Sequence, residues 1–296
     1  LVYDSRKIIP GCMFVCIKGA VFDGHAYIRE AVEKQAAAIV IEQETAVPDG
    51  PAVLKVDDTR LALAMLSAAW FGYPAEQLKT IGITGTKGKT TTTYMIRSIL
   101  ESAGHKVGLI GTIEAIIGDE RIPAANTTPE SYVVQEYFRK MADAGCDTCV
   151  MEVSSQGLMM HRVGGFLFDL GIFTNLEPDH IGPNEHASFD DYLFCKGMLF
   201  RQCRTGIVNA DDPRMHQVIQ GHTCTIGTYG FSNRADLRAE HVNLVRGPGY
   251  LGVSYHAAGN CDFDVEIDMP GTFSVYNSLT AIAVCRHLNV PVENMK

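Results

Sequence analysis

One short run of residues offers the groups that bind a phosphate. It reads Ile81-Gly-Ile-Thr-Gly-Thr-Lys-Gly-Lys-Thr-Thr91 and combines a strand pattern, a glycine turn and a helix start. The backbone N–H groups of such a turn and the positive end of the helix form a cradle for an anion. Within it, Lys89 can reach phosphate oxygens and Thr90 can offer a hydroxyl to Mg²⁺. Because Ile83 stands where the usual phosphate loop has a glycine, we expect a variant nucleotide-binding loop, with an ordinary strand–helix turn as the alternative.

Polar side chains also follow two other predicted strands. Glu152 ends one strand, and the run Thr174-Asn-Leu-Glu-Pro-Asp-His180 follows another. In an open parallel sheet, ligands bind beyond the carboxyl ends of the strands. Glu152 and His180 could therefore ligate the Mg²⁺ of a bound nucleotide, as carboxylates and imidazoles do at metal sites. The alternative is a zinc site of His161, His180 and His186, although their spacings match no zinc-ligand pattern.

Lys196 is a cation on the apolar face of a helix predicted over 189–203, with Ser188 as its N-cap. Its face also carries Phe189, Leu193, Phe200 and Cys203, and the opposite face carries Asp190, Asp191, Arg201, Gln202 and Arg204. The pattern predicts that Lys196 points inward. A buried ammonium must pair with an anion or lose its proton, and a neutral amine can react with CO₂ to give a carbamate. The alternative is a lysine that snorkels or forms an ion pair at the helix edge.

A mostly parallel sheet would bring these residues together. Strands are predicted at 80–84, 107–111, 147–153, 169–174 and 206–208, and helices at 88–102, 129–144 and 189–203. Strands separated by helices of this length imply right-handed crossovers and parallel pairing. From 223 to 268 the short alternating segments predict antiparallel strands, before a last helix at 274–288.

A smaller α/β unit precedes this sheet. Its predicted strands are 11–17, 37–42 and 54–56, its helices are 26–36 and 59–70, and residues 71–77 read as a linker. We therefore predict an α/β protein with two domains. The first is a small N-terminal domain, 1–78, and the second is a phosphate-loop ATPase-like central domain, 79–296, with an antiparallel addition.

Composition narrows the class of protein. The 296 residues are 46% hydrophobic and 20% charged with a net charge of −9, which suits a globular protein and disfavours a reader of nucleic-acid backbones. No apolar run approaches the roughly 18 residues of a membrane span, and the first residues lack signal-peptide character, so we expect a cytoplasmic protein without membrane partners. The nine cysteines suit reduced, buried thiols, and the Cys146-Asp-Thr-Cys149 spacing favours core cysteines over a redox or metal pair.

Taken together, the motifs resemble those of the Mur ligases, in the family's order and across nearly the whole chain. They are Asp4-Ser-Arg, Phe14-Val-Cys-Ile-Lys-Gly, Thr84-Gly-Thr-Lys-Gly-Lys-Thr-Thr, Asn126-Thr-Thr-Pro, Met151-Glu-Val-Ser-Ser-Gln-Gly-Leu, His161-Arg162, Phe173-Thr-Asn-Leu, Asp179-His180, Lys196, Asn209-Ala-Asp-Asp and Asn277. The first two motifs match the member type that adds a third amino acid, diaminopimelate or lysine, to UDP-N-acetylmuramoyl-L-alanyl-D-glutamate. The resemblance implies an ATP- and Mg²⁺-dependent amide ligase of peptidoglycan synthesis that acts through an acyl phosphate. We expect a monomer without nucleic-acid partners.

The resemblance also implies roles for particular residues. ATP would be bound by Gly85, Thr86, Lys87, Gly88, Lys89, Thr90 and Thr91, with Asn277 at the adenine. Mg²⁺ would be held by Thr90, Glu152, His180 and Lys196 as a carbamate, and Lys89, Lys196 and His180 would be catalytic. The uridine would contact Tyr3, Ser5, Ala20, Val21 and Phe22, and the muramoyl-dipeptide would contact Asn126, Thr127, Thr128, Ser154 and Arg162.

The chain departs from the family in three places. Met160 replaces a substrate-contacting glutamine of some relatives, and Gly182-Pro-Asn-Glu-His186 replaces an Asp-Tyr-His type of run. The family's third domain, which holds the acceptor amino acid, would begin after Lys296, so we expect these residues to be the first two domains and to lack turnover by themselves. Two alternatives stay open. They are a ligase like folylpolyglutamate synthetase, disfavoured by Asp4-Ser-Arg, and a non-catalytic nucleotide-binding module.

Overall fold

The computed structural model describes every residue of the chain except 20, 21, 180, 183 and 184. The helices are α1 (Ile28–Glu33), α2 (Thr59–Trp70), α3 (Lys89–Ser102), α4 (Ser131–Asp143), α5 (Ser155–Met159), α6 (Phe189–Gly197), α7 (Met215–Val218) and α8 (Thr272–His287). The strands are β1 (Met13–Val15), β2 (Ala38–Ile41), β3 (Ala52–Lys55), β4 (Lys79–Thr84), β5 (Val107–Ile110), β6 (Glu114–Ile117), β7 (Glu120–Pro123), β8 (Thr148–Glu152), β9 (Phe168–Phe173), β10 (Cys203–Asn209), β11 (Thr225–Gly230), β12 (Leu237–Gly247), β13 (Tyr250–Gly259) and β14 (Phe263–Ile267).

These strands form two sheets. The small sheet has the order β1-β2-β3 with parallel pairing. The large sheet has the order β14-β13-β12-β11-β10-β9-β4-β8-β5-β6-β7. Its centre, from β11 to β5, is parallel, and both edges end in antiparallel strands. The predicted α/β class with a mostly parallel sheet and an antiparallel addition is confirmed.

Helices cover both faces of the large sheet. On one face, α3 packs on β4, β5 and β8, and α8 packs on β10 to β13, through buried side chains such as Ile96, Leu100 and Leu279. On the other face, α4 and α6 contribute Phe138, Tyr192 and others to a second core. Strands β4 and β8 at the middle of the sheet are covered on both faces and are therefore buried along nearly their whole length.

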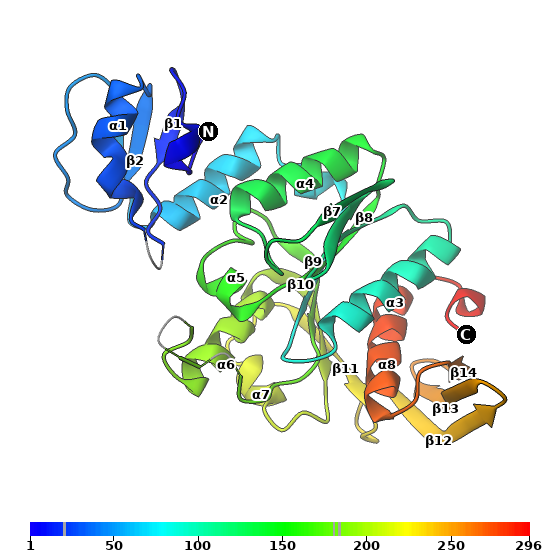
Figure 1. The fold of residues 1–296 in the computed structure, drawn as a ribbon. Helices are drawn as coiled ribbons and strands as arrows, with labels where there is room; N and C mark the ends of the chain where they lie inside the picture. Colours follow the sequence, from blue (N-terminus) through cyan, green and yellow to red (C-terminus); the bar gives the residue numbers. More distant parts are fainter. Residues whose placement is uncertain (20–21, 180, 183–184) are drawn as a thin grey trace.

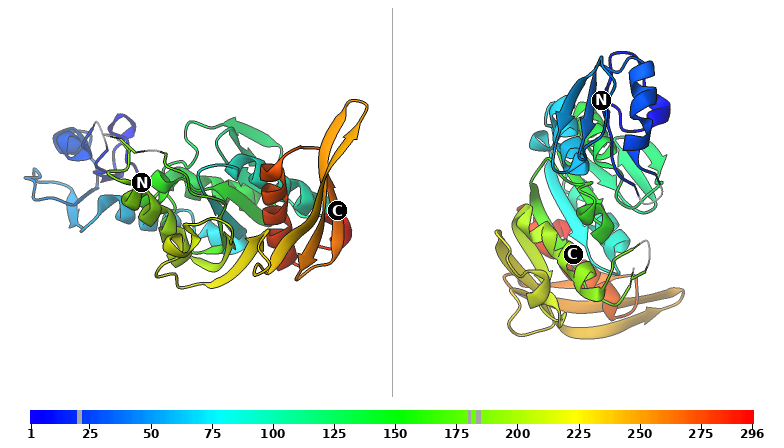
Figure 2. Two further views of the ribbon diagram at one scale, coloured as in Figure 1. Left: turned by 90° about the horizontal axis from the view of Figure 1, so that it is seen from below. Right: turned by 90° about the vertical axis from the view of Figure 1, so that its left-hand side faces the viewer.

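The two sheets lie at a distance from one another along an elongated molecule (Figures 1 and 2). Helix α2 leads from the small sheet toward α4, and the antiparallel strands β12 to β14 form the opposite end (Figure 1). None of the helices in the part of the chain that the structure describes is long and apolar enough to cross a bilayer.

The structure differs from the sequence-based expectations at several elements. Helix α6 ends at Gly197, continues as a 3-10 turn at Met198–Arg201, and gives way to β10 at Cys203, where a helix to 203 was predicted. Strand β11 is parallel to β10, so only β12 to β14 fulfil the antiparallel expectation. The hairpin β6–β7 and the short helices α5 and α7 were not predicted. Such short elements carry too few residues for a periodic pattern.

Candidate functional site

The phosphate-binding motif folds as a loop between β4 and α3. Gly85 and Gly88 adopt positive φ angles of 152° and 85°, which side chains other than glycine rarely tolerate. Asn175 holds the loop from the neighbouring segment, since its Oδ1 accepts the N–H of Lys87 at 2.9 Å and its backbone O accepts the N–H of Thr86 at 2.9 Å. The first N–H groups of α3 have no acceptor within the helix, so they are available to an anion at the loop.

Gly85→Ala is expected to destabilise the protein by about 2–5 kcal/mol, because a Cβ there adds backbone strain and collides with Thr174 Oγ1. The threonine cannot turn away freely, since its Oγ1 donates to Lys87 O at 2.8 Å. Gly104→Ala is the matched control, because Gly104 has a φ of 91° with open space around its Cβ position, and we expect a loss of about 1–2 kcal/mol there. Urea unfolding of the two variants would measure the difference. Equal losses would show that contact with Thr174 does not restrict position 85.

Two lysines converge on one carbonyl of the loop. Lys89 Nζ donates to Gly85 O at 2.9 Å and to Thr86 O at 3.2 Å, and Lys196 Nζ donates to the same Gly85 O at 3.0 Å. Lys196 is only 2% exposed, and its Nζ lies 4.4 Å from the centroid of the Tyr192 ring. The inward orientation predicted for Lys196 is therefore observed.

Burial and the neighbouring Lys89 ammonium lower the pKa of Lys196 well below its usual value, while Asp179 opposes the shift. Burial also lowers the pKa of Lys89, and this shift is opposed by Glu152 and Asp179. A larger fraction of neutral amine at Lys196 follows, and a neutral amine is the form that reacts with CO₂.

Glu152 is a buried carboxylate beside the loop. It is 1% exposed and accepts hydrogen bonds from Thr90 Oγ1 at 2.9 and 3.0 Å, from Thr112 N at 2.9 Å and from Thr112 Oγ1 at 3.0 Å. Thr112, which lies between β5 and β6, was not among the site residues predicted from the sequence. Hydroxyl and carboxylate oxygens are ligands that Mg²⁺ prefers, so the donor set of Thr90 and Glu152 fits this ion.

Most residues assigned to the muramoyl-dipeptide surround Glu152. Thr128 Oγ1 donates to Glu152 O at 3.0 Å and accepts from Ser154 N at 2.9 Å. Arg162 Nη1 donates to Thr128 O at 3.2 Å, and Thr127 Oγ1 lies 3.1 Å from Thr112 Oγ1. Thus the segments that flank α5 and precede α4 place hydroxyls and a guanidinium around the end of β8 that carries Glu152.

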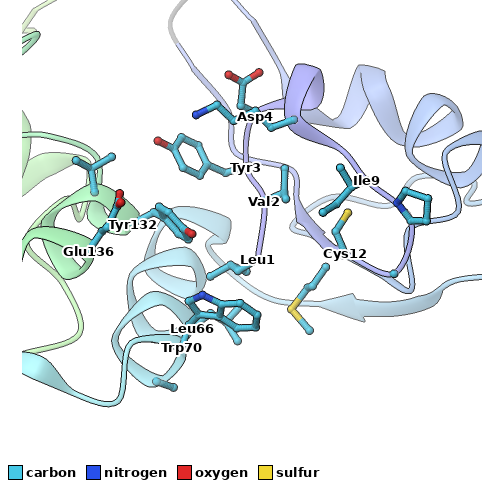
Figure 3. A pocket seen from close by; sticks show the side chains of 16 residues that line it. Leu1, Val2, Tyr3, Asp4, Ile9, Cys12, Leu66, Trp70, Tyr132 and Glu136 are labelled. Atoms are coloured by element: carbon cyan, nitrogen blue, oxygen red, sulfur yellow. The ribbon is translucent and has the colours of Figure 1, made fainter. Parts of the chain in front are cut away.

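Tyr3, Ser5 and Phe22, the described residues among those assigned to uridine, lie beside the small sheet. Tyr3, Ser5 and Phe22 line one cavity of about 550 Å³. Tyr3 also borders a larger cavity of about 950 Å³ between the N-terminal segment, α2 and α4, where Leu66, Trp70 and Tyr132 give a mostly apolar lining (Figure 3). The larger cavity is lined by none of the phosphate-loop residues, so its size does not make it the nucleotide site.

Other residues assigned from the sequence have side chains that do not contact Glu152, Lys89 or Lys196 in the described contacts. Lys87 points outward and pairs with Glu177 at 2.5 Å, and Asn126 is exposed. Thr91 is half-buried in the first turn of α3. Asn277, on α8, accepts from Thr92 Oγ1 at 3.3 Å and lies against Gly88. The assigned residues Ala20, Val21 and His180 lie outside the residues that the structure describes.

The histidines considered for zinc occupy separate environments. His161 Nε2 lies 3.3 Å from Asp58 Oδ2. His186 is fully buried, with Nε2 2.8 Å from Ser155 Oγ and Nδ1 3.1 Å from Asp191 Oδ2. The potential ligand atoms of His186, Asp191 and Cys195 lie within 4.8 Å of one another, and His161 is not part of this group. The geometry therefore gives no support to a zinc site shared by His161 and His186, and His186 instead links α5 to α6.

The cysteine pair shows the expected core environment. Cys146 and Cys149 are free thiols and buried in the core under α4. Burial raises the pKa of Cys149, which disfavours the reactive thiolate.

A parallel α/β sheet with a phosphate loop at the carboxyl end of a central strand, flanked by a carboxylate and an inward lysine, defines the class of phosphate-loop α/β proteins. Comparison with known families agrees with this geometry. The model of the Mur ligase middle domain matches residues 83–285, and that of the Mur ligase family, catalytic domain, matches residues 1–71. The chain belongs to the Mur ligase family, which confirms the resemblance seen in the sequence.

Individual relatives are similar over nearly the whole chain. The UDP-N-acetylmuramoyl-L-alanyl-D-glutamate--2,6-diaminopimelate ligase of Clostridium perfringens is 40% identical over 99% of this chain, and that of Bacillus licheniformis is 43% identical over 97%. The chain spans about 60% of the length of these curated relatives.

Solved structures show the same fold. A structure titled as a UDP-N-acetylmuramoyl-L-alanyl-D-glutamate--2,6-diaminopimelate ligase has a TM-score of 0.86 at 22% identity and covers 99% of this chain and 60% of its own. A folylpolyglutamate synthase of Mycobacterium tuberculosis has a TM-score of 0.61 at 15% identity and covers 80% of this chain and 61% of its own.

Proposed function

We propose that the chain provides the nucleotide-binding and UDP-substrate-binding parts of an ATP-dependent amide ligase. The ligase adds the third amino acid to UDP-N-acetylmuramoyl-L-alanyl-D-glutamate in peptidoglycan biosynthesis. Residues 1–78 would form the UDP-substrate domain and residues 79–296 the ATP-binding domain. The observation that carries the proposal is the convergence of Lys89, Lys196 and the Thr90–Glu152 pair at the phosphate loop. We further propose a monomer that acts in the cytoplasm.

At the phosphate loop, residues 85–91 would hold the phosphates of ATP, with the Lys87 side chain directed to Glu177 instead, and Asn277 would lie toward the adenine. Thr90 and Glu152, which are hydrogen-bonded to each other, would supply oxygen ligands for Mg²⁺. The family resemblance implies His180 as a further ligand. When bound, Mg²⁺ neutralises phosphate charge and polarises the transferred phosphoryl group. Lys89 would move its ammonium from the loop carbonyls to the phosphate oxygens, which form stronger charge-assisted hydrogen bonds.

Lys196 would act as a carbamate. Its nitrogen forms a bond to the carbon of CO₂ and releases a proton, which converts a cationic side chain into an anionic one. The carbamate would then offer an oxygen ligand to Mg²⁺ in place of an ammonium that repels it. Burial favours this modification because it already disfavours the ammonium.

The substrate would extend from the small sheet to the loop. The uridine would occupy the 550 Å³ cavity of Tyr3, Ser5 and Phe22, and Arg162 and Thr128 would hold the dipeptide. ATP would phosphorylate the substrate carboxylate, the amine of the third amino acid would attack the acyl phosphate, and phosphate would leave. The similarity to diaminopimelate ligases of Clostridium perfringens and Bacillus licheniformis supports diaminopimelate as that amino acid.

Calorimetric titration of the chain tests the proposed function. We expect separate, saturable binding of ATP with Mg²⁺ and of UDP-N-acetylmuramoyl-L-alanyl-D-glutamate. Binding of ATP without binding of the UDP-substrate would favour a simple nucleotide-binding module. Binding of a folate in place of the UDP-substrate would favour the folylpolyglutamate synthetase alternative.

A further inference from the structure

Glu130 lies between two arginines that come from different parts of the fold. Its Oε2 lies 2.9 Å from Nη1 of Arg60, at the start of α2, and 3.9 Å from Nε of Arg162, which follows α5. All three side chains are largely shielded, with exposed fractions between 14% and 22%. The cluster joins the helix that leaves the small sheet to the segment that precedes α4.

The charges in this cluster do not balance. Among the described residues, two guanidiniums face one carboxylate, and the other partners of the arginines are neutral carbonyls, Lys18 O for Arg60 and Thr128 O for Arg162. The nearby Asp58 caps α2 and pairs with His161 instead. Arg162 Nε is buried, and no atom of the described residues accepts a hydrogen bond from it. A buried donor without an acceptor and an excess positive charge both favour binding of a further anion.

The position of the two arginines indicates which ligand would carry such an anionic group. Arg60 Nε donates to Lys18 O at 3.0 Å, and Lys18 is followed by Gly19, which lines the 550 Å³ cavity assigned to uridine. Arg162 bonds Thr128, whose hydroxyl donates to Glu152 O. The arginines therefore lie between the proposed uridine cavity and the phosphate loop. A UDP-muramoyl-dipeptide that extends from the uridine cavity to the phosphate loop would place its diphosphate and carboxylate groups near these arginines.

The two carboxylate oxygens of Glu130 have different partners. Oε1 accepts a hydrogen bond from the N–H of Ser131 at 3.1 Å, at the first turn of α4, while Oε2 accepts a hydrogen bond from Arg60 and faces Arg162. The negative side chain at a helix N-terminus is stabilised by the unpaired N–H groups and the helix dipole. Glu130 can therefore leave the arginines without losing every partner.

We propose that Glu130 occupies the position of a substrate oxyanion when no substrate is bound. When substrate binds, its oxyanion displaces Glu130 and binds Arg60, which makes Arg60 a substrate-binding residue. The oxyanion is the diphosphate or a carboxylate of the dipeptide. This inference rests on the proposed function, because it takes the UDP-muramoyl-dipeptide as the ligand. Since the glutamate and the substrate compete for the same guanidiniums, Glu130 lowers the affinity for substrate and sets how readily the product can leave.

Calorimetry with three ligands and matched variants tests the proposal. Arg60→Gln is expected to weaken binding of UDP-N-acetylmuramoyl-L-alanyl-D-glutamate roughly 10- to 100-fold, since a charge-assisted contact is lost. Arg60→Lys keeps the charge but loses the planar fork, so an intermediate loss is expected. Glu130→Gln is expected to tighten binding about 3- to 10-fold by removing the competing charge.

Glu136→Gln is the control, because it removes the same charge from the same helix at a residue that pairs with Lys140. It should leave the affinity within about twofold. UDP and uridine identify the source of the oxyanion. A parallel loss for UDP in Arg60→Gln assigns the diphosphate, a loss for the whole substrate alone assigns the dipeptide carboxylate, and uridine should bind all variants equally.

Two results would overturn the inference. One is that Arg60→Gln and Arg60→Lys both bind the UDP-substrate with the same affinity as the unmodified chain. The other is weaker binding in Glu130→Gln, which would make the carboxylate a support for the site rather than a competitor. Failure of the unmodified chain to bind the UDP-substrate at all would contradict the proposed function itself, and with it this inference. Thermal unfolding of each variant separates loss of affinity from loss of fold.

Discussion

Lys196→Ala is expected to reduce amide ligation by a factor on the order of 10² to 10³, measured in a chain of the relatives' full length. Loss of one preorganised charge stabiliser typically has an effect of this size. The physical basis is the inward position of Lys196, whose Nζ donates to Gly85 O, the same carbonyl that accepts from Lys89. An unmodified ammonium there would repel Mg²⁺ held by Thr90 and Glu152, whereas a carbamate would bind it.

Chemical rescue and direct detection separate the carbamate from other roles of Lys196. Short-chain carboxylates such as acetate should partly restore ligation by Lys196→Ala, whereas the carboxylate introduced by Lys196→Glu should restore ligation poorly, because its side chain is too short to reach the position of the carbamate. Carbon-13 NMR with labelled bicarbonate should show a carbamate signal in the wild-type chain that Lys196→Ala lacks. Lys140→Ala, which removes a lysine from the α4 surface, is the control and should keep both signal and activity.

The stability of a second variant sharpens this test. Lys196→Met keeps the length of the side chain and removes a buried charge, so the unfolding temperature should be unchanged or raised while ligation is lost. A Lys196→Ala protein with undiminished ligation and no loss of the carbamate signal would remove the proposed role.

Lys89→Ala is expected to weaken ATP binding roughly 10- to 150-fold, because it removes a charge-assisted phosphate contact worth about 1.5–3 kcal/mol. The fold should lose little stability, since Lys89 Nζ bonds only to carbonyls of its own loop among the described contacts. Isothermal titration with ATP and Mg²⁺ measures the change in affinity.

The same loop supplies the control for this prediction. Lys87 lies two residues before Lys89, but its side chain pairs with Glu177 at the surface. Lys87→Ala should therefore change the ATP affinity by no more than about threefold, as for other exposed ion pairs. Equal losses in the two variants, or no loss in Lys89→Ala, would contradict the assignment of Lys89 to the phosphates.

The sequence was informative where residues repeat with a regular period or surround a glycine turn. Helix α2 was predicted at 59–70 and is found at Thr59–Trp70, because its Asp58 cap and its apolar spacing are both local signals. The end of α6 was predicted six residues too late. Phe200 and Cys203 continue the apolar spacing, but Phe200 lies in the 3-10 turn and Cys203 begins β10, so the spacing persists across three different backbone conformations.

The phosphate loop, the inward Lys196 and the family were all evident from the sequence, because each depends on neighbouring residues or on motifs in a fixed order. Contacts between residues far apart in the sequence were not evident from it. Thr112 reaches Glu152 across 40 positions, and Arg60 reaches Glu130 across 70. His186, considered as a zinc ligand from the sequence, is buried with its ring nitrogens next to Ser155 Oγ and Asp191 Oδ2.

The sequence by itself determined the local chemistry of this protein: a loop able to hold phosphate, a carboxylate after a strand, and a lysine on an apolar face. Only the tertiary structure decided which charges face one another. The parallel sheet aligns the carboxyl ends of β4 and β8, so Thr90 meets Glu152 and Lys196 meets Gly85. Hydrogen bonds and ion pairs act over a few ångströms, and contacts at that range between distant segments depend on how the helices and sheets pack.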